Sequence, residues 1–277
     1  MTETGPAVKA PFELKARVAS GIILIGVVVL VVVIGAQWFV TFAAIAGSLG
    51  LYEWHRLVNV GKLSFETVVG IVAIILAVVF AHLHLPLYCS AAAIVAGSVA
   101  AALSAAARRS WVLWHAFGAI YLGVPTLALV VMREDQIRGG AIVGGLFAAV
   151  WAADTAALFV GRALGGPRLA PKLSPNKTWS GFIGGVVAAG IAEAIYVAFF
   201  VGAVWQGALF GLFLGVAAAC GDLFESWVKR QFHAKNSGAL IPGHGGMLDR
   251  IDSLLLAAPA GAAILFLSGV DLFGAVG

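Results

Sequence analysis

The sequence predicts an all-α, polytopic integral membrane protein, and three observations lead to this fold class. Of the 277 residues, 61% are hydrophobic and only 11% are charged, with a mean hydropathy of +1.02, whereas a soluble domain carries roughly 25% charged residues. The apolar residues form runs near the roughly 20 residues that a membrane-spanning helix needs. Segments of about 10 residues with alternating polarity, which are typical of a membrane barrel, are not seen. Because lipid offers no partner to unpaired backbone groups, we expect helices to be the spanning elements.

We expect about nine transmembrane helices within one membrane domain, residues 1–277. Residues 1–140 hold the amino-terminal helices, and residues 141–277 hold the helices and cytoplasmic loops that carry the chemistry. The first apolar run exceeds the roughly 7–15 residues of a signal-peptide core, so we expect it to be retained. The expected spans are residues 18–35, 38–57, 66–84, 87–106, 111–132, 140–162, 180–202, 205–228 and 249–270.

The distribution of basic residues supports this count and predicts an orientation. With nine spans and a cytoplasmic amino terminus, 15 of the 17 Lys and Arg residues lie on the cytoplasmic side, and the outer loops hold only Arg133 and Arg138. This bias is the one that the positive-inside rule predicts. The net charge of +4 is small and has no basic patch suited to nucleic acid, so no nucleic-acid partner is expected.

Acidic residues gather around the cytoplasmic segment between the last two expected spans. Positions i, i+3, i+4 and i+7 share one face of a helix, and two such faces joined by a loop aim carboxylates at each other. Carboxylate oxygens suit Mg²⁺, which also binds substrate phosphates. The alternative is an ion-paired helix end that neutralises Lys229, Arg230 and Arg250. The residues concerned are Asp222, Glu225, Ser226 and Lys229 on the first face, and Asp249 and Asp252 on the second.

The segment "GALIPGHGGMLDRIDS" (residues 238–253) supplies groups that suit an anion. Its glycines permit close backbone approach, and N–H groups in such turns favour phosphate. The sequence therefore predicts a metal and phosphate site at the membrane surface. The expected contributors are Gly243, His244, Gly245 and Gly246, with positive charge from Lys229, Arg230, Lys235 and Arg250.

A second cytoplasmic loop, residues 161–181, carries four basic residues and several hydrogen-bond donors. Its alternative interpretation is a loop that attracts anionic headgroups non-specifically. A P-loop motif is absent, so a nucleotide would be held in another way. The candidate donors are Ser174, Asn176, Lys177 and Thr178.

Two acids outside these loops are interpreted more simply. Glu53 in "LYEWHRL" ends a span beside His55 and Arg56, and we expect it to form an interfacial ion pair. Glu193 lies within a span, and we expect a buried hydrogen bond to another helix.

The longest polar stretch, "SWVKRQFHAKNSGALIPGHGGMLDRID" (residues 226–252), closely resembles the signature of phosphatidate cytidylyltransferases, also called CDP-diacylglycerol synthases. The preceding "GDLFES", "SPNKTWSG" (residues 174–181) and "LKARVASGI" (residues 14–22) are similar to this family too. The resemblance covers roughly residues 154–253. The chain departs from the family pattern at Asn236, where Asp is usual, and at Ser180, where many members have Glu.

The resemblance implies a multi-pass enzyme of the bacterial cytoplasmic (inner) membrane, with its amino terminus in the cytoplasm. It would join CTP to phosphatidate from the membrane lipid, giving CDP-diacylglycerol and pyrophosphate, with one or two Mg²⁺ ions, and would form a homodimer. The implied catalytic residues are Asp222, Asp249, Lys229 and Arg230. The implied metal ligands are Asp222 and Asp249. Because four carboxylates gather in this cluster, Asp252 and Glu225 are the candidates for a second ion. Lys229, Arg230 and residues 242–246 match the family's substrate-holding segment. From both cytoplasmic loops together we expect substrate contacts from Ser174, Asn176, Lys177, Thr178, Ser226, Lys235, Asn236, Gly243, His244, Gly245, Gly246 and Arg250.

Three alternatives stay open at this point. A CTP-dependent polyprenol or phytol kinase would use related chemistry. A secondary transporter would use intramembrane acids such as Asp154 and Glu193 for ion coupling. A purely structural membrane protein would leave the carboxylate cluster unexplained.

Overall fold

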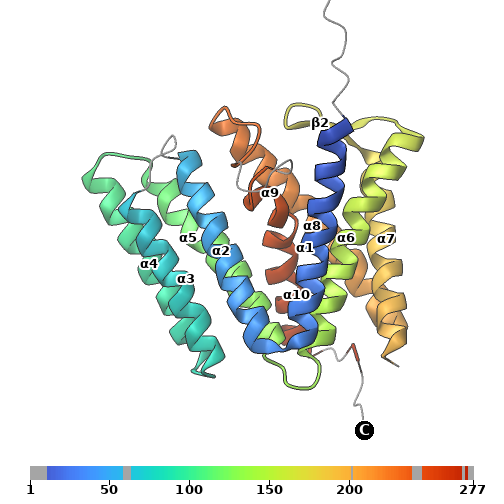
Figure 1. Ribbon diagram of the computed structural model, residues 1–277, viewed down its shortest axis with the longest axis horizontal. Helices are drawn as coiled ribbons and strands as arrows, with labels where there is room; N and C mark the ends of the chain where they lie inside the picture. Colours follow the sequence, from blue (N-terminus) through green and yellow to red (C-terminus); the bar gives the residue numbers. More distant parts are fainter. Residues whose placement is uncertain (1–10, 59–63, 201, 239–244, 270–271, 274–277) are drawn as a thin grey trace, which may run out of the picture.

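The computed structural model describes residues 11–58, 64–200, 202–238, 245–269 and 272–273. Within these ranges the chain folds into long helices and one small hairpin (Figure 1). The helices are α1 (Pro11–Ile34), α2 (Ala36–Val58), α3 (Phe65–His82), α4 (Leu87–Ala107), α5 (Val112–Arg133), α6 (Gly139–Leu164), α7 (Trp179–Phe199), α8 (Val204–Gln231), α9 (Leu248–Ile251) and α10 (Leu254–Ser268).

The helices follow the expected spans closely. Helices α2 to α8 begin and end within three residues of the limits expected from the apolar runs. The last expected span is broken, because a turn at Asp252 and Ser253 separates α9 from α10. Among the described residues, six helices, α3 to α8, are long and apolar enough to cross a membrane. The chain is therefore an all-α membrane protein, while the count of nine spans is not confirmed.

A short β hairpin interrupts the helical pattern between α6 and α7. Strand β1 (Arg168–Ala170) pairs antiparallel with β2 (Ser174–Thr178), with Arg168 opposite Thr178 and Ala170 opposite Ser174. The sequence predicted a loop here, because β1 has only three residues and β2 contains Pro175, so neither shows a clear alternation. The hairpin lies outside the helical bundle, so its backbone groups are not exposed to lipid at mid-membrane depth.

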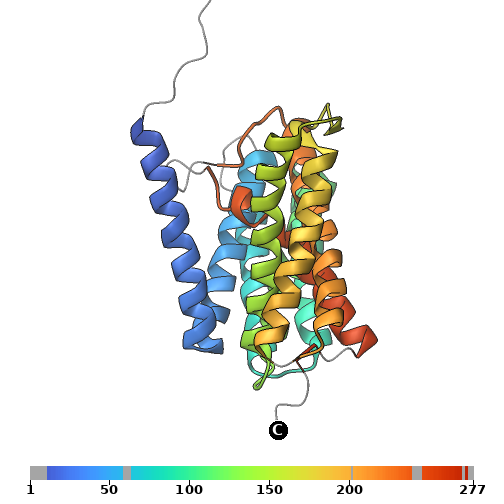
Figure 2. The same ribbon diagram turned by 90° about the vertical axis from the view of Figure 1, so that its right-hand side faces the viewer.

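Successive long helices run in opposite directions (Figure 1). The start of α1, the hairpin and the carboxyl end of α8 lie at the same end of the bundle, here called the hairpin end. The loop between α5 and α6, which holds Arg138, lies at the opposite end. Figure 2 shows α1 at one side of the bundle, where it packs against α2 and α6.

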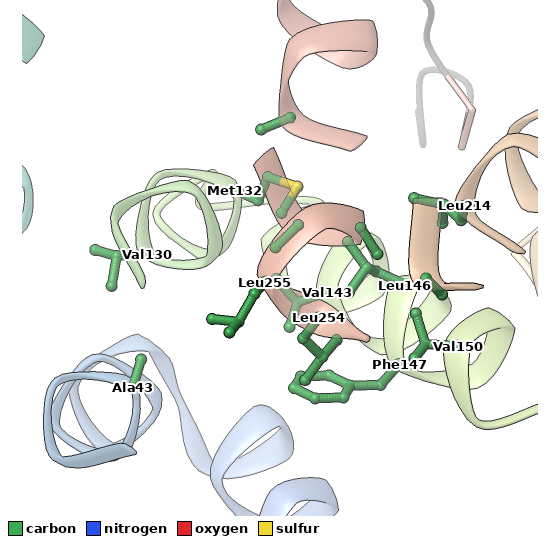
Figure 3. Packing of buried hydrophobic residues seen from close by; sticks show 14 of the residues in the cluster. Ala43, Val130, Met132, Val143, Leu146, Phe147, Val150, Leu214, Leu254 and Leu255 are labelled. Carbon is green, nitrogen blue, oxygen red and sulfur yellow. The ribbon is translucent and has the colours of Figure 1, made fainter. Parts of the chain in front are cut away.

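The centre of the bundle is built around α10. Leu254 and Leu255 at its start lie among buried side chains of α5 and α6 (Figure 3). Met132 of α5 and Phe147 of α6 belong to the same buried cluster. Since lipid is as apolar as leucine, such helices associate mainly through close van der Waals packing. This packing fixes the start of α10, and with it the turn that carries Asp252.

Candidate active site

A cavity of about 860 Å³, with several charged side chains in its lining, lies beside the hairpin. Its walls come from α6, α7, α8, the hairpin and the segment from α9 to the start of α10. Four carboxylates and three cationic side chains line it, which is an unusual charge density for a chain with 11% charged residues. The charged lining residues are Asp154, Asp222, Asp249 and Asp252, with Arg162, Arg168 and Lys177.

Lys177 and Asp222 connect the two loops that the sequence predicted to carry the chemistry. The Lys177 ammonium of β2 forms an ion pair with the Asp222 carboxylate of α8, and both side chains are partly exposed to the cavity. Ser226, one turn further along α8, donates a hydrogen bond to Asp222 Oδ1 at 3.5 Å. The helical spacing predicted that Asp222 and Ser226 share one face of α8. The pairing with Lys177 depends on the hairpin, because the hairpin carries Lys177 to that face.

The turn between α9 and α10 brings two more carboxylates to the cavity. A Cβ atom on Gly221 would lie only 2.5 Å from the Asp252 carbonyl oxygen, so this position of α8 accepts no side chain without a backbone shift. The close approach places Asp252 beside α8. The Ser253 hydroxyl donates to Asp154 of α6, 3.3 Å from each carboxylate oxygen. Asp154 therefore belongs to the same cavity wall.

Lys229 lies between two acids. Its ammonium forms an ion pair with Glu225, one turn earlier in α8, and contacts Asp249 Oδ1 at 2.7 Å. Glu225 is only 1% exposed and Lys229 14%. Because a buried carboxylate is costly without a partner, Lys229 compensates both acids. The alternative of an ion-paired helix end thus describes this part of the cluster.

Asp249 and Asp252 lie in the segment before α10, outside the candidate membrane spans. Their surroundings shift the pKa values of the two carboxyl groups in opposite directions. Burial raises the pKa of Asp252, and the nearby negative charge of Asp222 raises it further. Burial also acts on Asp249, but hydrogen bonds from Lys229 and the Gly246 N–H outweigh it and lower the pKa of this carboxyl. The cavity therefore holds one firmly ionised carboxylate beside one whose ionisation needs a compensating cation.

The hairpin is anchored to α7 by Thr178. Its hydroxyl accepts a hydrogen bond from the Gly181 N–H at 3.1 Å and caps the helix. Ser180, which stands where many members of the resembled family have Glu, hydrogen-bonds to the Gly165 carbonyl and to Thr178. It takes part in the connection between α6 and α7 and does not line the cavity.

The structure brings part of the predicted site together. The predicted residues that line the cavity are Asn176, Lys177, Thr178, Asp222, Asp249 and Asp252. Glu225, Ser226, Lys229 and Gly246 contact these residues or their neighbours without lining the cavity. The others outside the lining are Ser174, Arg230, Lys235, Asn236, Gly245 and Arg250. Gly243 and His244 lie outside the described residues.

The acids do not form a protein-only metal cage. In the described part of the chain, no group of three His, Cys, Asp or Glu side chains has the arrangement of a metal site. This matters for the kind of ion that fits, because Mg²⁺ typically takes one or two carboxylates and completes its shell with water and substrate phosphates.

Two acids of the site region were not predicted as site residues. Asp154 was read only as an intramembrane acid, although it lies two turns before Arg162 and lines the same cavity. Glu53 was expected in an interfacial ion pair, and that interpretation is wrong. Its side chain is 1% exposed and accepts hydrogen bonds from Ser237 and Leu248. Neither contact has a signal in the sequence, because the partners lie far apart in the chain.

The chain is similar to known proteins over most of its length. The model of the cytidylyltransferase family matches residues 15–268. The phosphatidate cytidylyltransferase of Brucella suis is 40% identical over 259 residues, which cover 93% of this chain and 93% of the relative. The enzyme of the same name from Pseudomonas aeruginosa is 34% identical, over 84% of this chain and 89% of the relative. The Haemophilus influenzae protein of that name is 43% identical over half of each chain.

Proposed function

Because the chain belongs to the cytidylyltransferase family, we propose that it transfers the cytidylyl group of CTP to phosphatidate, giving CDP-diacylglycerol and pyrophosphate. The observation that carries this proposal is the charged cavity at the hairpin end, in which Lys177 and Asp222 meet. Relatives named phosphatidate cytidylyltransferase match nearly the whole chain, so the proposal covers the complete reaction.

The cavity suits a nucleoside triphosphate. Its volume of about 860 Å³ lies within the roughly 300–1,000 Å³ of small-molecule sites. Lys177, Arg162 and Arg168 supply positive charge for phosphate oxygens. Arginine binds such oxygens in a bidentate manner, and lysine acts as a point charge.

A second, apolar hollow of about 90 Å³ is far smaller than the roughly 300–1,000 Å³ of small-molecule sites, so it offers the lipid substrate an apolar surface and does not enclose it. Side chains of α1, α2, α5, α6 and α10 line it, together with Met247, Arg250 and Ile251. Acyl chains suit such a surface, while Arg250 suits the phosphate headgroup. Phosphatidate would thus enter from lipid between helices, with its headgroup toward the charged cavity.

The reaction needs positioning and charge neutralisation more than a strong base. A phosphate oxygen of phosphatidate attacks the α-phosphorus of CTP. A new phosphorus–oxygen bond forms, the bond from the α-phosphorus to the oxygen that bridges it to the β-phosphorus breaks, and pyrophosphate leaves with that bridging oxygen. The attacking oxygen is already anionic, so no group must remove a proton. In such transfers most of the rate gain comes from orientation and electrostatic stabilisation. Lys177 would bind phosphate charge, and Lys229 would hold Asp249 in place.

The donor set fits magnesium. All candidate ligands are carboxylate oxygens, and Asp222, Asp249 and Asp252 line one cavity. One or two carboxylates with substrate phosphates are what this ion prefers. Asp222 and Asp249 would hold a first ion, and Asp252 would face a second. Glu225 is buried against Lys229 and does not line the cavity, so it does not fit the expected ligand role. When bound, the ion neutralises negative charge on the triphosphate.

The alternation of the helices supports the proposed topology. With nine spans and a cytoplasmic amino terminus, the hairpin end faces the cytoplasm, where CTP is available. The bacterial relatives support placement in the cytoplasmic (inner) membrane. A homodimer, implied by the resemblance, is best tested by measuring the particle mass in nanodiscs.

The test uses CTP labelled at two positions, with purified protein, Mg²⁺ and phosphatidate. A cytidylyltransferase places α-³²P in the lipid and γ-³²P in pyrophosphate. A CTP-dependent lipid kinase would place γ-³²P in the lipid, so that result would replace the proposed reaction. Chelation of the metal with EDTA should stop transfer, and added Mg²⁺ should restore it. Solute uptake into proteoliposomes without lipid turnover would favour the transporter alternative.

A further inference from the structure

Glu53 of α2 holds both ends of the glycine-rich segment in the carboxy-terminal half. Its Oε2 atom accepts a hydrogen bond from the Ser237 hydroxyl at 3.1 Å and from the Leu248 N–H at 2.8 Å. Ser237 precedes the undescribed residues 239–244, and Leu248 begins α9. One buried carboxylate oxygen therefore connects two points of the segment to a helix from the opposite half of the chain.

The segment approaches Glu53 so closely that side chains are excluded. A Cβ atom on Gly238 would collide with Oε1, and a Cβ atom on Gly246 would collide with Oε2. Glycine at these two positions therefore lets the backbone close around the carboxylate. The arrangement is specific, because it needs an acceptor on α2 and small residues on the segment.

The same two points of the segment orient Asp249. The Ser237 N–H donates to Asp249 Oδ2 at 3.1 Å, and the Gly246 N–H donates to the same oxygen at 2.9 Å. The other oxygen, Oδ1, contacts Lys229. Both carboxylate oxygens are thus fixed, and the two backbone donors belong to the stretches that contact Glu53.

We propose that Glu53 is a positioning residue for the reaction: it holds residues 237–238 and 246–248 so that their N–H groups fix the Asp249 carboxylate toward Lys229 and the cavity. Glu53 does not line the cavity and acts only through this segment. The effect on the rate rests on the proposed function, whereas the hold of Glu53 on the segment can be measured without any activity.

The essential property is the hydrogen-bond acceptor at the Oε2 position. Within the described residues, Oε1 has no hydrogen-bond partner. A glutamine can therefore place its amide oxygen at the Oε2 position and still accept both bonds. Glu53→Gln should preserve the arrangement, whereas Glu53→Ala removes the acceptor.

The kinetic test compares Glu53→Ala and Glu53→Gln with a matched control variant, Glu66→Ala. Glu66 is equally buried, pairs with Arg108 and does not line the cavity. Since a misplacement of about 1 Å can cost roughly 100-fold in rate, Glu53→Ala should lower kcat/KM for CTP by about that factor. Glu53→Gln should stay within about fivefold, because it keeps the hydrogen bonds. Glu66→Ala should lower thermal stability in detergent but leave the KM for CTP unchanged.

Hydrogen exchange provides a readout that needs no activity. In Glu53→Ala, amides in residues 245–252 should exchange at least about tenfold faster, while α3 and α4 keep their protection. Ser237→Ala, which removes one of the two donors, should give a smaller change of the same kind. Unchanged exchange and kinetics in Glu53→Ala, equal loosening throughout the protein, or a Glu53→Gln as impaired as Glu53→Ala would overturn the proposal. If the wild type fails to transfer cytidylyl groups, the proposed function is wrong, and the exchange result still decides the positioning role.

Discussion

Lys177 at the end of the hairpin pairs with Asp222 of α8, and this contact joins the two polar segments that the chain keeps apart. Lys177 belongs to the hairpin and Asp222 to a long helix later in the chain, and only the folded bundle brings them into one cavity. The pair places a cation and a carboxylate side by side, which suits a site that must hold both phosphate oxygens and a metal ion.

Lys177→Met should strongly reduce cytidylyl transfer. It removes a cation from the cavity and leaves Asp222 without its partner, so we expect kcat/KM for CTP to fall by about 100-fold or more, as for loss of other transition-state stabilisers. Steady-state kinetics with labelled CTP measures this. Lys172→Met is the matched control, because Lys172 lies in the same hairpin region, is exposed and does not line the cavity. Equal losses in both variants would mean that general positive charge, and not Lys177, matters.

Asp249→Asn should abolish most activity while the protein stays folded. The asparagine can still accept one hydrogen bond, but it loses the charge that Lys229 and a magnesium ion would share. We expect a decrease of about 100- to 1,000-fold in kcat, measured beside the melting temperature in detergent. Asp135→Asn, at the opposite end of the bundle, should leave kcat unchanged. Full activity of Asp249→Asn would remove Asp249 from the proposed metal site.

The limits of most helices could be predicted from the sequence, because apolar runs end at charged or turn-forming residues. The break between α9 and α10 could not. It depends on the close approach of the Asp252 carbonyl to Gly221 of α8, a contact with another helix that local periodicity does not report. The hairpin was also missed, since β1 has only three residues.

The site was predictable where its residues share one helix face. Glu225 and Lys229, one turn apart, form the ion pair that their spacing favours. Contacts between distant segments had no signal: Glu53 and Ser237 are 184 residues apart. A single sequence reports local periodicity and composition, and a buried acceptor beside two glycines becomes visible only after the helices pack.

Asn236→Asp should change activity little, although Asp is usual at this position in the resembled family. The side chain of Asn236 is exposed and does not line the cavity. A charge placed there is screened by water and salt, and exposed charges contribute little to local interactions. We expect kcat/KM for CTP to change by less than about threefold. A tenfold gain would show that this position reaches the substrate during turnover.

Glu193→Gln should retain cytidylyl transfer, which separates the proposed enzyme from a transporter that couples ions through intramembrane acids. Glu193 is fully buried between helices: a Cβ atom on Gly145 of α6 would lie 2.6 Å from its Oε1 atom, and one on Gly211 of α8 would lie 2.7 Å from its Cβ. Neither carboxylate oxygen has a hydrogen-bond partner among the described residues, so the expected hydrogen bond to another helix is not observed there.

The glutamine keeps the shape of Glu193 and carries no charge, so it should raise the thermal stability, because an unpaired buried acid is costly in a membrane. Activity should stay within about threefold of the wild type, since Glu193 does not line the cavity. Asp154→Asn is the matched comparison: it changes an intramembrane acid that does line the cavity and accepts a hydrogen bond from Ser253. We expect it to lower kcat/KM by about tenfold or more. If the effects were reversed, with Glu193→Gln inactive and Asp154→Asn normal, the reaction would depend on the interior of the membrane and not on the cavity at the hairpin end.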